Sequence, residues 1–175
     1  MLKGKNVNLR IVEKEDLSLV AEWLNDPEVF GVFNPLIQHS KTELEQWYDK
    51  LSAEGRWFFI EKKDGSKIGE IHHLKDMEIG YGLVPSERGK GYCTEAVKIM
   101  VDYLFLSKNI VRIYALTNVR NVASQKVLEK AGFKKEGVIR KSLFVRGEWR
   151  DRCIYGILRE EWKEPKILTK TTPQE

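Results

Sequence analysis

Apolar residues recur along this chain at two spacings, one typical of strands and one typical of helices. Alternation of apolar and polar residues predicts a strand, and apolar residues three and four positions apart predict one face of a helix. Alternation predicts a strand at residues 7–11, and further strand-like runs predict strands at residues 57–61, 67–74, 78–84, 111–117, 138–144 and 153–158. The helical spacing predicts helices at residues 17–24, 41–51, 94–106 and 123–131.

Several of these segments carry their own start and stop signals. Ser40 and Glu43 have the spacing of a capping box, in which each side chain accepts a hydrogen bond from a free backbone N–H. Asp64-Gly65 is a hairpin signal, and Gly132 is expected to end the last helix. The resulting order, β-α-α-β-β-β-α-β-α-β-β, predicts an α+β domain on a central mixed, mostly antiparallel sheet flanked by helices.

Composition agrees with one soluble folded domain. The 175 residues are 42% hydrophobic and 32% charged, and the net charge of +4 is too mild and dispersed to indicate nucleic-acid binding. No apolar run reaches the roughly 20 residues that span a membrane. There is no signal-peptide pattern at the start and there are two cysteines, so we expect a cytoplasmic protein without a disulfide framework or zinc site. Residues 1–163 are expected to form the domain, and residues 164–175 a frayed polar tail.

The segment Arg88-Gly-Lys-Gly-Tyr-Cys93 lies between a predicted strand and a predicted helix. Gly89 and Gly91 let the backbone approach a ligand closely, and the amides of the turn and of the helix N-terminus form an anion site. Arg88 and Lys90 add positive charge. The expected ligand is therefore a phosphate or pyrophosphate, although a turn of this kind is equally often a tight structural turn.

Two familiar phosphate motifs do not fit this segment. A P-loop needs Gly where Val84 stands and Ser or Thr where Gly91 stands. A dinucleotide fingerprint needs a small residue where Thr94 stands, and it follows the N-terminal strand of a β-α-β repeat.

A second motif lies about 30 residues further on, where Asn121 and Ser124 open a helix within Asn121-x-x-Ser-x-x-Val-Leu-Glu-Lys-x-Gly-Phe133. With both motifs the chain resembles the GNAT acetyltransferase superfamily, most of all its RimJ/RimL-like branch, whose best-known members acetylate N-termini of ribosomal proteins. The pyrophosphate turn of the superfamily, (Arg/Gln)-x-x-Gly-x-(Gly/Ala), matches at Arg88, Gly91 and Cys93. Cys93 departs from the usual Gly or Ala but is only slightly larger. The resemblance covers roughly residues 4 to 162.

The resemblance implies a GNAT-like acyl-CoA N-acyltransferase fold, with two strands splayed around acetyl-CoA as cosubstrate. Unpaired backbone groups at the end of the strand 78–84 are expected to contact pantetheine, and one N–H to polarise the thioester carbonyl. The expected cofactor contacts are Gly82, Leu83, Val84, Arg88, Gly89, Lys90, Gly91, Tyr92, Cys93, Thr94, Asn121 and Ser124.

Three residues are candidates for catalysis, each with a structural alternative. Glu78 is the candidate general base, since similar positions carry a carboxylate in GNAT enzymes; otherwise it is a solvated strand end. Ser124 is the candidate proton donor to the leaving thiolate, and otherwise an ordinary residue of the first helical turn. Asn121 contacts the cofactor or is a plain N-cap. Gly80 and Gly82 allow close ligand approach or relieve packing.

The predicted function is N-acetyltransfer from acetyl-CoA to a primary amine, by direct attack in a ternary complex without metal. A protein or peptide N-terminus comes first by resemblance. An α-amino group near pKa 7.7–8.0 also needs a weaker base than a lysine near 10.4. The alternatives are a small amine such as a polyamine, amino acid or amine antibiotic, and a non-catalytic acyl-CoA-binding module. We expect a monomer or homodimer that binds neither nucleic acid nor membrane.

The remaining chemistry-bearing residues have simpler interpretations. His72 and His73 are neighbours on a strand and point to opposite faces, so they cannot share a metal and are expected to be ordinary sheet histidines. Cys153 is expected in the core, and Cys93 is not expected to be a nucleophile. Residues 30–35 are either core or part of the acceptor site.

Overall fold

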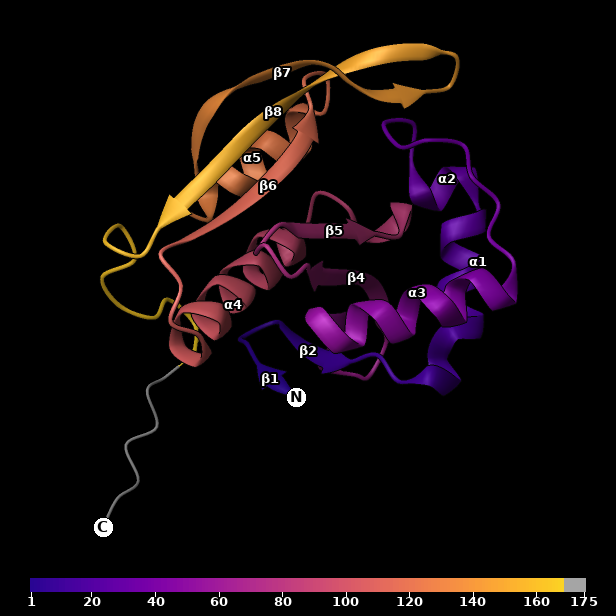
Figure 1. Cartoon of the computed structure of the whole chain (residues 1–175). Helices are drawn as coiled ribbons and strands as arrows, with labels where there is room; N and C mark the ends of the chain where they lie inside the picture. Colours follow the sequence, from indigo (N-terminus) through magenta and orange to yellow (C-terminus); the bar gives the residue numbers. More distant parts are fainter. Residues whose placement is uncertain (169–175) are drawn as a thin grey trace.

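The structure, a computed structural model, describes residues 1–168 and contains two antiparallel sheets (Figure 1). The first sheet has the order β1-β2-β3-β4-β5 and the second the order β6-β8-β7. The first sheet consists of β1 (Leu2–Lys3), β2 (Val7–Ile11), β3 (Arg56–Lys62), β4 (Lys67–His73) and β5 (Ile79–Leu83). The second consists of β6 (Arg112–Asn118), β7 (Lys134–Val145) and β8 (Glu148–Leu158).

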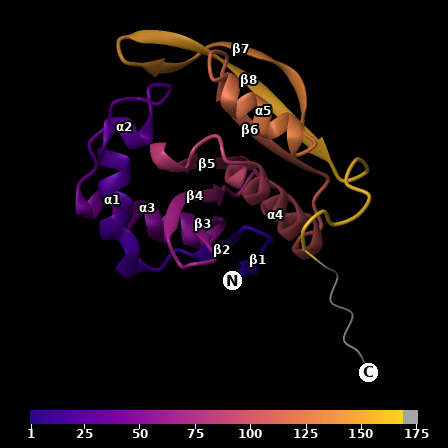
Figure 2. The same ribbon diagram turned by 180° about the vertical axis from the view of Figure 1, so that it is seen from behind.

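Helices cover both faces of the first sheet (Figures 1 and 2). Successive residues of β3 point to opposite faces: Phe59 packs into the cluster of α1 and α3, and Phe58 into the cluster of α4. None of the described helices is long and apolar enough to cross a membrane. The helices are α1 (Leu17–Asn25), α2 (Pro27–Phe30), α3 (Lys41–Glu54), α4 (Tyr92–Ser107) and α5 (Val122–Lys130).

The two sheets meet at one point, where β5 begins. Glu78 and Tyr114 form an isolated parallel bridge, and Tyr114 N–H donates to Met77 O at 3.2 Å. Beyond this bridge β5 pairs only with β4, and β6 only with β8. The expected splay of two strands is therefore confirmed, whereas the expected single mixed sheet is two sheets joined by one bridge.

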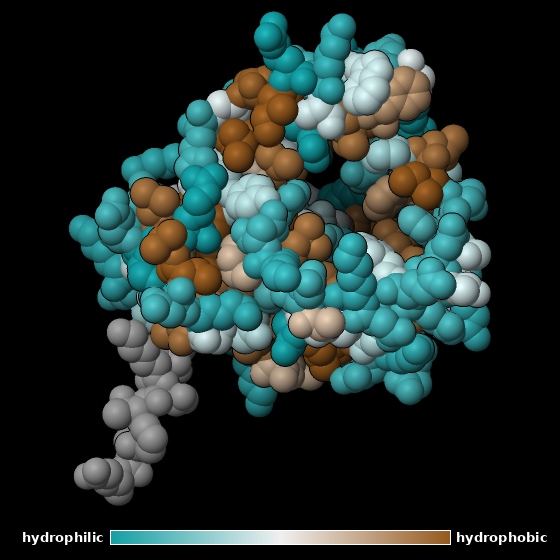
Figure 3. All heavy atoms as spheres, in the orientation of Figure 1, coloured by the Kyte–Doolittle hydropathy of each residue, from teal (hydrophilic) through white to brown (hydrophobic). Residues whose placement is uncertain are grey.

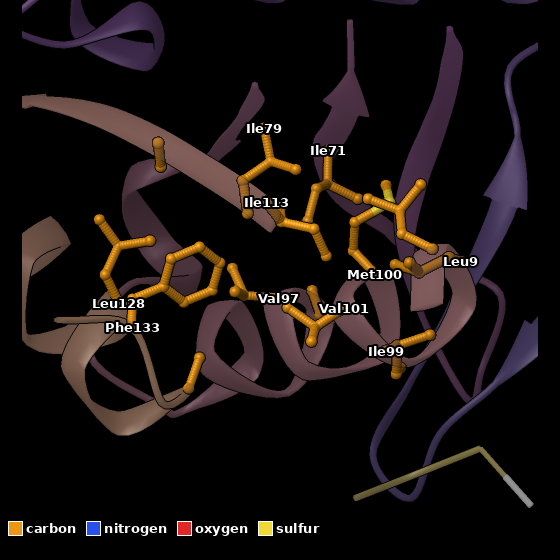
Figure 4. Close-up of a cluster of buried hydrophobic side chains, with 14 of the residues drawn as sticks. Leu9, Ile71, Ile79, Val97, Ile99, Met100, Val101, Ile113, Leu128 and Phe133 are labelled. Carbon is orange, nitrogen blue, oxygen red and sulfur yellow. The ribbon is translucent and has the colours of Figure 1, made fainter. Parts of the chain in front are cut away.

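One core nevertheless joins the two sheets, because α4 packs against both (Figure 4). Val97 and Val101 of α4 lie in one cluster with Ile71 of the first sheet and Ile113 of the second. These residues are at most 2% exposed. The core thus fixes the start of α4 in front of the gap between β5 and β6.

Most predicted boundaries agree with the structure, and the clearest misses have local reasons. The capping box is confirmed, with Glu43 N–H donating to Ser40 Oγ at 3.2 Å and Ser40 N–H to Glu43 Oε2 at 2.7 Å. The short helix α2 was not predicted; Asp26 caps it and Pro27 is its first residue. The strands β7 and β8 are longer than predicted, because exposed polar residues of β7 and register shifts obscure the alternation.

The expectation of a frayed chain from residue 164 is wrong for residues 166–168. Asp102, fully buried in α4, accepts hydrogen bonds from the backbone amides of Lys166, Ile167 and Leu168 at 2.6–3.0 Å. It also accepts one from Trp162 Nε1 at 2.8 Å. The rest of the expected tail, residues 169–175, lies outside the described residues.

Candidate active site between the splayed strands

The turn before α4 presents a group of free backbone N–H donors. Gly89 and Gly91 have φ of 77° and 85°, and Gly91 precedes α4 without any side-chain cap. Within the described chain, the amides of residues 89–94 have no hydrogen-bond acceptor. A Cβ added at either glycine would meet no atom within 4 Å. Unpartnered amides facing open space at a helix N-terminus suit an anion such as a pyrophosphate.

The two basic side chains of this turn are bound to neighbouring parts of the protein. Arg88 Nε donates to Leu83 O at 2.9 Å, and Arg88 Nη2 donates to Val29 O at 2.7 Å. Lys90 Nζ pairs with Glu87 Oε2 at 3.0 Å. Arg88 therefore ties the end of β5 to α2, and the donors that face open space are main-chain amides.

The exposed edge of β5 follows from the alternation of an antiparallel ladder. Val84 N–H donates to Ile68 O and Leu74 N–H to Glu78 O, both at 2.9 Å, so the even-numbered residues of β5 pair with β4. The expectation of unpaired backbone groups is therefore wrong for Val84 N–H and, by alternation, for Gly82. The groups that point to the gap belong to Leu83 and Tyr81.

Two cavities lie along this gap, and Figure 3 shows a hollow between the β7–β8 hairpin and the α2 side. The first, here the turn cavity, has a volume of about 350 Å³ and is bordered by Arg88, Gly89 and Cys93. The second, here the His72 cavity, has a volume of about 220 Å³ and is bordered by Glu70, His72 and Arg152. The residues lining both cavities are Phe33, Asn34, Tyr81, Asn121 and Ser124.

A hydrogen bond between Tyr81 and Ser124 marks the junction of the two cavities. The Tyr81 hydroxyl lies 2.9 Å from Ser124 Oγ, and burial raises the pKa of Tyr81 well above its usual value. Asn121 Oδ1 accepts from Ser124 N–H at 3.1 Å, which confirms the N-cap interpretation of Asn121. Both predicted residues of the second motif therefore reach the junction.

Cys93 lines the turn cavity as a neutral thiol. Burial raises its pKa to about 12, so it carries almost no thiolate at neutral pH. The other cysteine, Cys153, is 1% exposed, as expected of a core residue.

Glu78 lies beside the bridge between the sheets and does not line either cavity. Its Oε2 accepts a long hydrogen bond, 3.5 Å, from the Tyr114 hydroxyl. Burial, and then the neighbouring Asp76 carboxylate, raise the pKa of Glu78. The carboxylate that borders the His72 cavity is Glu70, whose Oε2 lies 3.0 Å from His72 Nδ1.

The structure also separates residues that the sequence left ambiguous. Residues 30–34 line the turn cavity, whereas residues 57–59 are buried core. The packing interpretation of Gly80 is confirmed, because a Cβ there would lie 2.6 Å from the His72 ring. Sequence reasoning missed Tyr81, and it missed Glu70 beside His72. Their signal was present: Glu70 and His72 are two apart on one strand and so share a face.

Residues 6–134 match the family described as acetyltransferase (GNAT) domain, and the chain belongs to this family. It is an acetyl-CoA-dependent N-acetyltransferase, which confirms the predicted family, fold and cosubstrate.

Among curated relatives, "Probable N-acetyltransferase YjcK" of Bacillus subtilis is 33% identical and covers 90% of this chain and 97% of its own. "Putative ribosomal N-acetyltransferase YdaF" of Bacillus subtilis is 35% identical, over 93% of this chain and 97% of its own. Spermidine N(1)-acetyltransferase of Escherichia coli is 29% identical, over 99% of this chain and 100% of its own. Among solved structures, spermidine N-acetyltransferase from Vibrio cholerae with CoA and spermine has a TM-score of 0.81 at 24% identity, over 91% of this chain and 99% of that one. This last likeness establishes the fold alone.

Proposed function

We propose that this enzyme acetylates the α-amino group of a peptide or protein N-terminus, by direct attack of the amine in a ternary complex with acetyl-CoA. The observation that supports this acceptor is the balance of charge in the His72 cavity. Within the described chain, the acidic and basic side chains that line that cavity are one carboxylate, Glu70, one guanidinium, Arg152, and the imidazole of His72.

A cavity with this balance suits an acceptor that carries one positive charge. An N-terminal α-amino group has a pKa near 7.7–8.0, so about a tenth or more of it is already neutral at pH 7. Arg152 offers N–H donors to a peptide carbonyl and repels the additional charges of a polyamine. Spermidine carries several ammonium groups, which an excess of carboxylates would bind better.

The turn cavity takes the acyl donor in this proposal. The free amides of residues 89–94 hold the pyrophosphate at the N-terminus of α4, where the helix dipole also favours negative charge. Bound acetyl-CoA supplies a thioester whose carbonyl carbon accepts the amine nitrogen. The outward N–H groups of Tyr81 and Leu83 donate to the donor molecule, one of them to the thioester oxygen.

Residues of the second motif act on the sulfur. Ser124 Oγ, held by Tyr81 at the junction of the cavities, donates a proton to the leaving thiolate. Asn121 fixes Ser124 through its cap of α5. Glu78, which the sequence suggested as the base, lies directly before β5 and contributes a fixed negative charge near His72.

A spermidine-like polyamine is the second candidate acceptor. It is favoured by the similarity to the Escherichia coli spermidine N(1)-acetyltransferase, which spans nearly the whole of both chains.

An acceptor panel distinguishes the two candidates. We would measure thiol release from acetyl-CoA at pH 7.5 with a lysine-free peptide bearing a free N-terminus, an N-terminally blocked peptide bearing one lysine, and spermidine. We expect kcat/KM to be at least tenfold higher for the free N-terminus, with the acetyl group located on it by mass spectrometry. Arg152→Gln is expected to bring the kcat/KM for spermidine closer to that for the free N-terminus. A higher kcat/KM for spermidine would refute the proposed acceptor.

A further inference from the structure

Three side chains form a hydrogen-bonded series beside the His72 cavity. Trp57 Nε1 on β3 donates to Glu70 Oε2 on β4 at 2.8 Å, and the same oxygen lies 3.0 Å from His72 Nδ1. Trp57 is 2% exposed, and the side chains of Glu70 and His72 are 17% and 19% exposed. The Glu70 carboxylate is thus held in place from behind and contacts the imidazole in front.

This contact determines which ring nitrogen of His72 is free. An ionised carboxylate only accepts hydrogen bonds, so Nδ1 carries the hydrogen and donates it to Glu70. In neutral His72 the lone pair then belongs to Nε2. Within the described chain Nε2 has no hydrogen-bond partner, and His72 lines the cavity assigned above to the acceptor.

The ring is also fixed from the side of β5. His72 and Gly80 are direct partners in the β4–β5 ladder, and a Cβ at Gly80 would lie 2.6 Å from both Nε2 and Cε1. Trp47 of α3 packs edge-on against the ring, with centroids 6.2 Å apart. Nε2 is therefore held over β5, one residue before Tyr81 at the junction of the cavities.

The charges facing His72 come from both strands that hold it. Glu70 lies on its own strand and Glu78 directly before β5, while Trp47 and Trp57 contribute no charge from α3 and β3. Arg152 of β8 faces the same cavity. Burial lowers the pKa of His72, and Glu70 and Glu78 together raise it above its usual value. The imidazole therefore changes its charge at a higher pH than an unperturbed histidine does.

We propose that His72 is the catalytic base that takes the proton of the acceptor ammonium, and that Glu70 is the positioning residue that presents Nε2 to it. This rests on the proposed function. Nε2 takes one proton from R–NH₃⁺, and the nitrogen lone pair of R–NH₂ attacks the thioester carbon. A C–N bond forms and the C–S bond breaks. Ser124 Oγ gives its proton to the thiolate and is reprotonated by the second nitrogen proton, while His72 returns its proton to water.

The proposal is tested by the pH dependence of kcat/KM from pH 5.5 to 9.5, using the free N-terminal peptide. The kcat/KM of wild type is expected to fall about tenfold for each pH unit below the pKa of His72. His72→Gln is expected to be at least 100-fold slower at pH 7, to lack that inflection, and to approach wild type above pH 9, where the amine is already neutral. Its Kd for acetyl-CoA is expected within threefold of wild type.

Three further variants separate positioning from folding effects. Glu70→Gln is expected to be five- to twentyfold slower at pH 7, with the inflection at lower pH, since the carboxylate no longer stabilises the imidazolium. Gly80→Ala displaces the His72 ring without removing it and is expected to lower kcat/KM at pH 7 at least tenfold. His39→Gln, a histidine that lines neither cavity, is the matched control and is expected to retain wild-type rates.

A nuclear magnetic resonance readout does not depend on activity. The ¹H–¹⁵N correlations of the imidazole are expected to show neutral His72 as the Nδ1–H tautomer in wild type. The proposal would be overturned if neutral His72 were the Nε2–H tautomer. It would also be overturned if kcat/KM of H72Q at pH 7 were within threefold of wild type, or if Glu78→Gln rather than His72→Gln removed the inflection. Wild type that releases no thiol with any amine would overturn the proposed function as well, whereas an active wild type with unchanged H72Q would overturn only the role of His72.

Discussion

Gly91→Ala and Gly65→Ala form a matched pair of substitutions that tests the anion site. The two glycines have left-handed backbone, with φ of 85° and 86°, and at both an added Cβ would meet no atom within 4 Å. Gly91 precedes α4, whereas Gly65 lies in the turn between β3 and β4. The two alanines should therefore introduce the same backbone strain at different places.

The cost to folding is expected to be equal for the two variants. An L-residue pays about 1–2 kcal/mol in the left-handed region. Alanine also reduces the conformational entropy of the unfolded chain relative to glycine, which offsets about 0.4–1 kcal/mol of that cost. We expect each variant to lower the free energy of unfolding by about 1 kcal/mol.

The cost to acetyl-CoA binding is expected to differ. Relief of the strain at Gly91 turns its peptide planes and moves N–H groups of residues 89–94 away from the anion. The loss of one hydrogen bond to a charged group costs about 1.5–3 kcal/mol, which is about tenfold or more in Kd. At Gly65 the same relief moves no group near either cavity.

Calorimetric titration of acetyl-CoA and urea unfolding of both variants provide the two measurements. We expect the Kd of Gly91→Ala to rise at least tenfold and that of Gly65→Ala to stay within twofold. An unchanged Kd in Gly91→Ala, or an equal rise in both variants, would show that the turn does not bind the pyrophosphate through its amides.

Three further substitutions or reactions test other parts of the structure. Ser124→Ala is expected to lower kcat about tenfold with the Kd of acetyl-CoA unchanged, since it removes the proton donor to sulfur; an unchanged kcat in steady-state assays would contradict this role. Asp102→Asn is expected to lower the free energy of unfolding by about 2–4 kcal/mol in urea, because one amide oxygen cannot replace the carboxylate that accepts four N–H groups. Cys93, with its pKa raised to about 12, has about one thiolate in ten thousand at pH 8, so iodoacetamide should leave it unmodified for hours in mass spectra; rapid labelling would contradict the raised pKa.

Much of the fold could be predicted because its signals are local. The capping box at Ser40, the glycine after the last helix and the strands on either side of Asp64-Gly65 depend on neighbouring residues, and the structure has each of them. The two motifs could be placed for the same reason, since each combines a turn with the start of a helix. The partners of these motifs could not be read from the chain, because side-chain direction in the turn depends on distant carbonyls. Arg88, predicted as a phosphate contact, donates to Val29 O, 59 residues away.

The catalytic interpretation changed most, and the change comes from tertiary packing. Glu78 is the base expected by resemblance, since similar positions carry a carboxylate in GNAT enzymes, yet the bridge to Tyr114 holds it beside the gap and outside both cavities. His72 looked like an ordinary sheet histidine. Its environment depends on Gly80 across the ladder, Trp47 of a separate helix and Glu70 fixed by Trp57.

The sequence by itself determined the family, the acyl donor and the position of the glycine-rich turn before α4, because glycines and helix starts act over a few residues. The tertiary structure decided which N–H groups of β5 face the gap, which carboxylate borders the His72 cavity, and that Tyr81 and Ser124 meet between two cavities. These properties depend on strand register and on the divergence of β5 from β6. Both are set by the packing of α4 against two sheets, which brings together residues that are far apart in the chain.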